Sequence, residues 1–137
     1  MKKRLIVAVI LVLILAAVIR FRFALAYMFI GGETVHLQRS EISSVTGTSV
    51  TSVPVMQAGL TESQIDVFVE KFNSLGLKRI PVRYTKKGGW LYSFSAFRND
   101  GTFVSIAFLE GGLVTVDGYT CVTLKPVSGI MGEFFQN

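Results

Sequence analysis

The side chains that most often carry catalysis or bind metals are scarce in this sequence. It contains one histidine, His36, and one cysteine, Cys121. A zinc site with several nitrogen or sulfur ligands cannot be assembled from one such chain, and no nucleophile–histidine–acid triad is evident. We expect His36 to be solvated in a polar stretch and Cys121 to be a small core residue on a strand. The pattern indicates no metal and no cofactor.

The carboxylates have simpler explanations than acid–base chemistry. Glu62, Asp66 and Glu70 recur at four-residue spacing, which is typical of the solvated face of a helix. Asp100 and Asp117 each precede a glycine and are expected in turns. No remaining pair has a spacing that suggests a general acid and a general base. The sequence therefore predicts a protein that is not an enzyme; the alternative is an anchored hydrolase-type enzyme with a site that the pattern does not reveal.

One cluster of cations stands out in the second half of the chain. Its five cations fall within ten residues, on an expected edge strand and the turn after it: Lys78, Arg79, Arg83, Lys86 and Lys87. The aromatic residue Trp90 follows them and is included in the cluster. Such a surface could bind an anionic surface polymer or a protein partner. The competing explanation is that these cations keep an exposed strand edge from aggregating. The cluster is the candidate binding site.

The net charge of +5 does not indicate a nucleic-acid-binding protein. Five of the fourteen cations precede residue 31, and the other nine balance all nine acidic residues of the chain. The excess charge therefore flanks the apolar N-terminal segment, where cations meet lipid headgroups. The residues expected at the membrane interface are Lys2, Lys3, Arg4, Arg20 and Arg22.

The N-terminal segment has the pattern of a signal anchor. Leu5 to Ile19 is an unbroken run of fifteen apolar residues, and apolar residues resume at Phe23. We predict a transmembrane helix over residues 1–30 that contacts membrane lipids, with the N-terminus in the cytoplasm and the rest of the chain extracytoplasmic, because more cations precede the run than follow it. The small residues Ala24 and Ala26 leave a second interpretation open, in which cleavage after Ala26 yields a secreted domain.

The remainder has the composition of one globular domain, since half of the 137 residues are apolar and only 17% are charged. We expect a polar stem at 31–48 and an extracytoplasmic domain at 49–137. Strands are predicted at 49–55, 78–84, 90–98, 102–109, 113–116 and 119–125, with an amphipathic helix capped by Thr61 and ended by Gly76. The predicted fold class is α+β: one helix packed in two layers on an antiparallel meander of four to five strands.

Several short motifs between residues 60 and 125 resemble a known group of proteins. They are Phe72-Asn73-Ser74-Leu75, Lys87-Gly88-Gly89-Trp90, Asn99-Asp100-Gly101 and Val114 to Tyr119. This succession resembles small membrane- or lipid-anchored extracytoplasmic domains of Gram-positive bacteria with no assigned function. The resemblance implies a fold and a bacterial cell-surface location, and it carries over no catalytic residue. The expected function is that of a membrane-anchored binding or accessory module.

Overall fold

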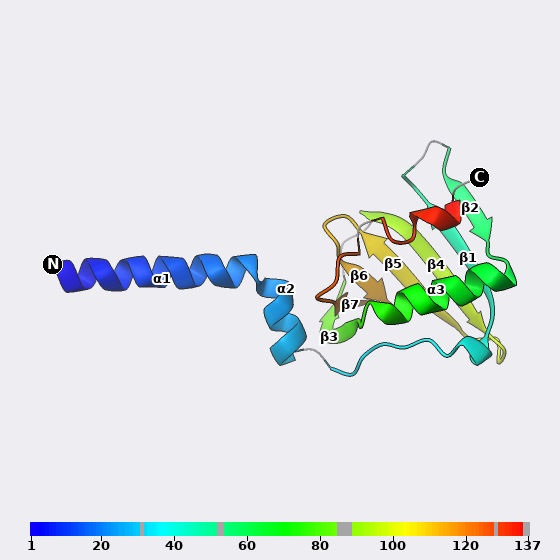
Figure 1. Ribbon diagram of the computed structural model, residues 1–137, viewed down its shortest axis with the longest axis horizontal. Coiled ribbons are helices and arrows are strands. Elements are labelled where there is room, and N and C mark those ends of the chain that lie inside the picture. The colour runs from blue at the N-terminus through cyan, green and yellow to red at the C-terminus, as the bar shows by residue number, and fades with distance from the viewer. Residues whose placement is uncertain (31, 52–53, 85–88, 128, 136–137) are drawn as a thin grey trace.

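The computed structural model shows one α+β domain and a helix that projects from it (Figure 1). It describes residues 1–30, 32–51, 54–84, 89–127 and 129–135. The predicted fold class is confirmed at the level of α+β with an antiparallel sheet. The sheet is larger than expected, because it contains seven strands in place of four or five.

The N-terminal segment is not one continuous helix. The α-helix α1 (Lys2–Arg20) ends at Phe21, and a short helix α2 (Arg22–Leu25) and a π-helical turn η1 (Ala26–Ile30) then change the direction of the chain (Figure 1). The expected unbroken helix over residues 1–30 is therefore wrong. Among the described residues, no helix combines the length and the apolar character needed to cross a membrane. The uncharged part of α1 covers only about 22 Å, against about 30 Å of bilayer hydrocarbon.

The sheet places strands that are distant in sequence next to each other. Its strand order is β2-β1-β4-β5-β6-β7-β3, and all neighbours are antiparallel. The bounds are β1 (Ile42–Ser49), β2 (Met56–Gly59), β3 (Lys78–Arg83), β4 (Trp90–Arg98), β5 (Phe103–Leu109), β6 (Val114–Val116) and β7 (Tyr119–Val122). Only β4 to β7 form the expected meander of consecutive strands.

Three sequence-based predictions about the strands are corrected by this topology. The stretch that we expected to be a polar stem contains β1, which pairs with β4 along most of its length. Beyond Ser49, where β1 ends, no strand is found over the described part of the range 49–55; β2 begins at Met56, and residues 52–53 lie outside the described residues. In addition, β3 does not pair with β4, which follows it in sequence. It pairs with β7 and forms the edge of the sheet opposite to β2.

The amphipathic helix α3 (Glu62–Ser74) is formed as predicted. The Thr61 hydroxyl accepts a hydrogen bond from the Gln64 backbone, and the Gln64 side chain accepts one from the Thr61 backbone, which completes a capping box. After the helix, Gly76 adopts a φ of 58°, a left-handed conformation that favours glycine. The apolar side of α3 buries Ile65, Phe68, Val69 and Phe72 against one face of the sheet.

An aromatic cluster forms the centre of the core between α3 and the sheet. The Phe68 and Phe94 ring centroids lie 4.8 Å apart, and Phe134 and Phe135 from the C-terminal turn η3 (Gly132–Phe135) pack on the same rings. The C-terminal segment thus contributes to the core. Gly47 of β1 lies under these rings, where any side chain would collide with them.

Candidate anion-binding site

The candidate site lies at the β3 edge of the sheet. β3 has a single strand neighbour, β7, and it contains Pro81, which cannot donate a backbone hydrogen bond. The expectation that the basic strand lies at the edge of the sheet is therefore confirmed. The sheet register places Arg79 opposite Cys121 and Arg83 opposite Tyr119. Both arginines thus project from the edge strand over the residues of β7.

Tyr119 holds both guanidinium groups. The central carbon of the Arg79 guanidinium lies 5.0 Å from the Tyr119 ring centroid, and that of Arg83 lies 4.6 Å from it. Arg83 also donates a hydrogen bond of 3.2 Å to the Tyr119 hydroxyl. Stacking on an aromatic face orients a guanidinium while leaving its edge N–H groups available to an anion. We call Arg79, Arg83 and Tyr119 the arginine pair site.

The arginine pair site has an excess of positive charge. None of the ion pairs found among the described residues includes Arg79 or Arg83. Two other cationic side chains behave differently: Arg39 binds the Glu62 and Asp66 carboxylates at 2.6 and 2.5 Å, and Lys71 binds Glu133. Arg39 and Lys71 are thus neutralised by carboxylates, whereas Arg79 and Arg83 form no ion pair with another described residue.

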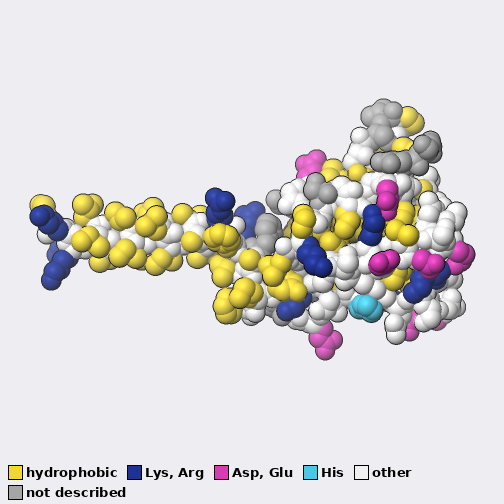
Figure 2. Space-filling view, viewed as in Figure 1, with side chains coloured by type: hydrophobic (Ala, Val, Ile, Leu, Met, Phe, Trp, Pro, Cys, Tyr) yellow, Lys and Arg dark blue, Asp and Glu magenta, His cyan; other side chains and the backbone are white. Residues whose placement is uncertain are grey.

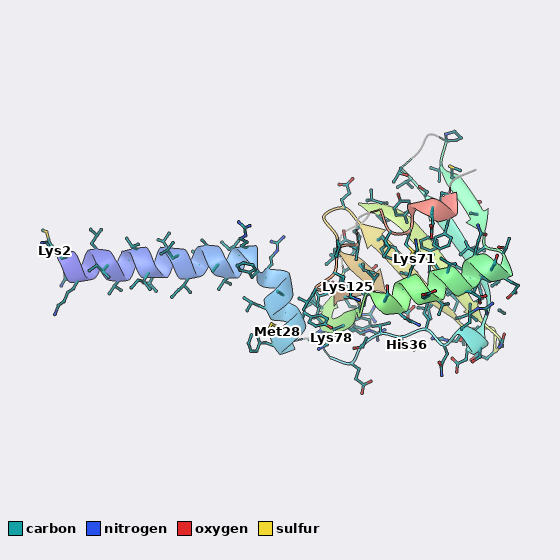
Figure 3. The ribbon with its side chains drawn as sticks, in the orientation of Figure 1. Lys2, Met28, His36, Lys71, Lys78 and Lys125 are labelled. Atoms are coloured by element: carbon teal, nitrogen blue, oxygen red, sulfur yellow. The ribbon has the colours of Figure 1, made fainter. Side chains whose placement is uncertain are left out.

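The rest of the predicted basic cluster is only partly assembled here. Lys78 starts β3 but turns its ammonium group toward the Tyr27 ring of η1, at 4.3 Å from the centroid (Figure 3). Trp90 is half-buried at the start of β4, opposite Leu109, on a strand that is not adjacent to β3. Lys86 and Lys87 lie outside the described residues.

Next to the arginine pair, a cavity of about 660 Å³ opens between the sheet and the segment 32–37, which we call the strap. Four hydrogen bonds hold the strap in place. Two join backbone groups, from Gly32 to the Arg79 carbonyl and from Val35 to the Leu77 carbonyl. In the other two, the Asn73 side-chain amide accepts from the Leu37 N–H group and donates to the Leu37 carbonyl. Arg79 and Tyr119 line the cavity, and Arg83 does not.

Sequence reasoning missed this cavity and one residue of the site. The strap was taken for part of a flexible stem, although Val35 and Leu37 alternate with polar residues in it and are half-buried and buried, respectively. Tyr119 was treated only as a strand residue, because the pairing of β3 with β7 brings it to Arg79 and Arg83 from about forty positions away.

The other residues that the sequence analysis considered for chemistry are Cys121 and His36. Burial, offset in part by the charge of Arg79, raises the pKa of the Cys121 thiol to about 11. His36 is exposed on the strap below α3, as Figure 3 shows, and its ring nitrogen lies 3.5 Å from the Asn73 amide. Within the described part of the chain, no three His, Cys, Asp or Glu side chains gather as metal ligands would. Whether the protein is an enzyme is not tested by this arrangement and stays a prediction.

Comparison with known proteins assigns no family and no function to this chain. No protein-family model matches the sequence, and no curated protein or solved structure is significantly similar to it. The resemblance to anchored extracytoplasmic domains of Gram-positive bacteria accordingly stays an expectation, and function has to be argued from the site itself.

Proposed function

We propose that the protein is a membrane-bound, non-enzymatic binding module that captures an anionic surface polymer or acidic partner at the arginine pair site. The observation that carries the proposal is that Arg79 and Arg83 stack on one ring, Tyr119, with no carboxylate in ion-pair contact among the described residues. Two oriented guanidinium groups suit the bidentate recognition of phosphate or carboxylate groups.

The membrane part of the proposal is supported by the surface of α1. None of its residues is buried, and its apolar side chains surround the helix on all visible sides (Figure 2). Cations gather at its two ends, Lys2, Lys3 and Arg4 before the apolar run and Arg20 and Arg22 after it. An exposed apolar surface of this extent is typical of a segment in contact with lipid.

The short apolar length of α1 sets how it would sit in the bilayer. Arginine and lysine stems can lie along the hydrocarbon while their charged ends reach the headgroups, and the bilayer can thin locally around a short helix. In the proposed arrangement, α1 enters the membrane with its N-terminus on the cytoplasmic side, and α2 and η1 lie at the outer interface. The domain then faces the extracytoplasmic side.

Anion capture is tested with the full-length protein in phosphatidylcholine nanodiscs, with long-chain polyphosphate as the probe. Replacing both Arg79 and Arg83 with alanine is expected to weaken binding by about tenfold or more, because hydrogen bonds to charged groups are lost. The matched control replaces Lys71 and Lys125 with alanine, which removes the same charge elsewhere. Equal losses in the two double variants would reduce the effect to net charge and refute the site.

Membrane attachment and topology need a separate experiment. Intact mass and membrane fractionation of a C-terminally tagged protein, followed by protease treatment of intact cells, distinguish the three arrangements. The proposal expects a full-length, membrane-bound product whose tag is digested. A soluble product that begins at Tyr27 would show a secreted domain, and a tag protected until lysis would show the opposite orientation.

A further inference from the structure

The sheet has a second face, on the side away from α3 and the aromatic cluster. Side chains alternate between the two faces of a strand, so the neighbours of core residues project to the opposite side. Over residues 44–48 of β1, 93–97 of β4 and 103–107 of β5 this alternation is complete. The core-facing residues are buried there, and the residues between them are exposed or half-buried. We call the solvent side of β2, β1, β4 and β5 the outer face.

The register of the sheet aligns the outer-face side chains in rows that run across the strands. Two neighbouring rows consist of small residues, most of them with a hydroxyl group: Thr46, Ser95 and Ser105 in one, and Thr48, Ser93 and Ala107 in the other. Neighbours within a row are about 4.8 Å apart, and the rows are about 6.8 Å apart. Among the described residues, none of these five hydroxyl groups forms a hydrogen bond, whereas those of Ser43 and Ser49 do.

An aromatic pair borders the two rows. Phe97 and Phe103 are partners in the register of β4 and β5, and their ring centroids lie 5.5 Å apart. Phe103 is 54% exposed, so one side of its ring is open to solvent. Ser44 continues this third row on β1, opposite Phe97. The outer face thus combines an apolar platform with a field of small hydroxyl groups.

The described residues of the outer face include no charged side chain. β1, β2 and β5 contain no Asp, Glu, Lys or Arg, and β4 contains only Arg98 at its end. Arg98 is on the core side of β4, since it alternates with Phe94 and Ala96 and lines the cavity under the strap. The surface of a soluble domain usually intersperses charges of both signs. An uncharged area over four adjacent strands therefore suits an uncharged ligand.

The composition of the outer face argues against most classes of macromolecular partner. Nucleic acids and anionic polymers need cations, and a lipid surface needs cations or a larger apolar area. The cores of protein–protein interfaces are depleted in serine. A neutral polysaccharide fits, because serine and threonine hydroxyls can both donate to and accept from sugar hydroxyls. The C–H face of a sugar ring also packs on an open aromatic ring such as Phe103.

We propose that the outer face binds a neutral, β-linked polysaccharide chain. The chain lies flat on the sheet, with one sugar ring on Phe103 and its neighbours hydrogen-bonded to Thr46, Ser95 and Ser105. The four strands give a surface about 14 Å wide, which contacts a short stretch of such a polymer. This site goes beyond the proposed function and does not depend on it, because the arginine pair site is at the opposite edge of the sheet, on β3 and β7.

The test uses the full-length protein in phosphatidylcholine nanodiscs, with cellohexaose and chitohexaose as probes and surface plasmon resonance as the readout. We expect saturable binding of at least one probe with a Kd below about 1 mM. Maltohexaose should bind at least about tenfold more weakly, because its α-linked chain is curved and does not lie flat on a sheet. No saturable binding of either β-linked probe up to about 10 mM would overturn the proposal, and so would equal binding of maltohexaose.

Two exposed positions in the first row allow the site to be blocked without disturbing the core. Thr46→Glu and Ser105→Glu should each weaken binding by about tenfold or more, because the new carboxylate loses water under a neutral ligand. Ser63→Glu is the matched control, since it adds the same charge at an exposed position of α3, across the sheet. Its Kd should stay within about twofold of wild type. Wild-type affinity in Thr46→Glu, at an unchanged melting temperature, would contradict the site.

The removal of the aromatic platform gives an independent check. Phe103→Ala should weaken binding by about threefold to tenfold and leave the hydroxyl rows in place. Binding that is unchanged in this variant and in Ser105→Glu would show that the sugar is held elsewhere.

Two further measurements separate this inference from its alternatives. Mass photometry of the nanodiscs would detect two copies paired through their outer faces, and a dimer that Thr46→Glu dissociates would replace the polysaccharide as the occupant. The double replacement of Arg79 and Arg83 with alanine should leave the binding of the β-linked probe unchanged, and Thr46→Glu should leave polyphosphate binding unchanged. Loss of sugar binding in the arginine variant would sink this inference alone. Polyphosphate binding that the arginine variant retains would sink the proposed function alone.

Discussion

The ammonium nitrogen of Lys78 lies 4.3 Å from the centre of the Tyr27 ring, and this contact joins the N-terminal segment to the edge strand of the domain. The Tyr27 hydroxyl also lies beside Gly76, 3.6 Å from where a Cβ atom on that residue would stand. Lys78 is thus turned away from the arginine pair site and toward η1. The junction between the two parts of the chain is a cation–aromatic contact at the end of the strap.

Removing this ring is expected to loosen the strap. A cation–aromatic contact at an exposed site contributes about 0.5 to 1 kcal/mol, so Tyr27→Ala should raise hydrogen exchange at the Gly32 and Val35 amides by about two- to fivefold. Both amides donate hydrogen bonds to the residues that surround Lys78. Tyr27→Phe keeps the ring face and serves as the control. Exchange that is identical in all three proteins would show that the contact does not hold the strap.

Gly47 is expected to tolerate no side chain. A Cβ atom there would stand 2.7 Å from the Phe94 ring and 2.9 Å from the Phe135 ring, and the aromatic cluster leaves these rings no room to move. Overpacking of this kind costs about 1 to 3 kcal/mol, which Gly47→Ala should show in urea unfolding.

Gly59→Ala is the matched control for Gly47→Ala. Gly59 lies on the neighbouring strand β2, and a Cβ atom there meets nothing within 4 Å. Its substitution should leave the free energy of unfolding within about 0.5 kcal/mol of wild type. A similar loss of unfolding free energy in both variants would mean that the loss comes from replacing any strand glycine and not from the contact with Phe94.

Arg39 is expected to stabilise the start of α3 through two carboxylates at once. Its guanidinium binds Glu62 and Asp66 and also donates to the Ile42 carbonyl. The hydrogen bond to Asp66, and then that to Glu62, raise the pKa of Arg39. Arg39→Lys should behave like Arg39→Ala, because an ammonium group cannot match the planar fork that reaches all three acceptors. Both variants should lower the melting temperature slightly, and the loss should shrink in 1 M salt, where the Debye length is about 3 Å. A lysine variant as stable as wild type would contradict the role of the fork.

The elements predicted correctly are those with local signals. The cap at Thr61, its partner Gln64 and the left-handed Gly76 all act within a few residues, and the structure has each of them. The missing N–H group of Pro81 likewise restricts it to an edge strand or to the beginning of a strand, and it lies within the edge strand β3. Such features depend on neighbouring residues and need no knowledge of the rest of the fold.

The errors concern contacts between distant parts of the chain. β1 was not predicted because two of its buried residues, Gly47 and Ser49, are small or polar; the rings of Phe94 and Phe135 fill the space beside Gly47. The alternation of apolar residues is therefore weak in β1 itself. Its pairing with β4 spans about fifty residues, and no local pattern encodes it.

The candidate site could be predicted only in part, because it too depends on contacts between distant parts of the chain. Arg79 and Arg83 stand out by their type and spacing, but their common ring, Tyr119, reaches them only through the pairing of β3 with β7. The pairing of the acidic residues of α3 with Arg39 is likewise a long-range contact. A solvated helix face was expected there, and Glu62 and Asp66 do remain largely exposed within their ion pairs.

Cys121 is expected to be unreactive while the domain is folded. It is 1% exposed, and burial raises its pKa to about 11, so roughly one thiol in a thousand is ionised at pH 8. Labelling with a disulfide reagent should therefore be at least about 100-fold slower in the folded protein than in urea, where the pKa returns to about 8.5. Labelling of the native protein at the rate of a free thiol would show that the β6–β7 region opens readily.

The same shift predicts a dependence of stability on pH. Because the thiol loses its proton at a lower pH in the unfolded chain than in the folded one, ionisation favours unfolding. The contribution of Cys121 to stability is thus complete below pH 8 and declines as the pH rises from about 8.5 toward 11. Cys121→Ala is the control that separates the contribution of the Cys121 thiol from the titration of tyrosine and lysine side chains. The difference in melting temperature between the two proteins should change between pH 8 and pH 10 in favour of the variant, and a constant difference would contradict the raised pKa.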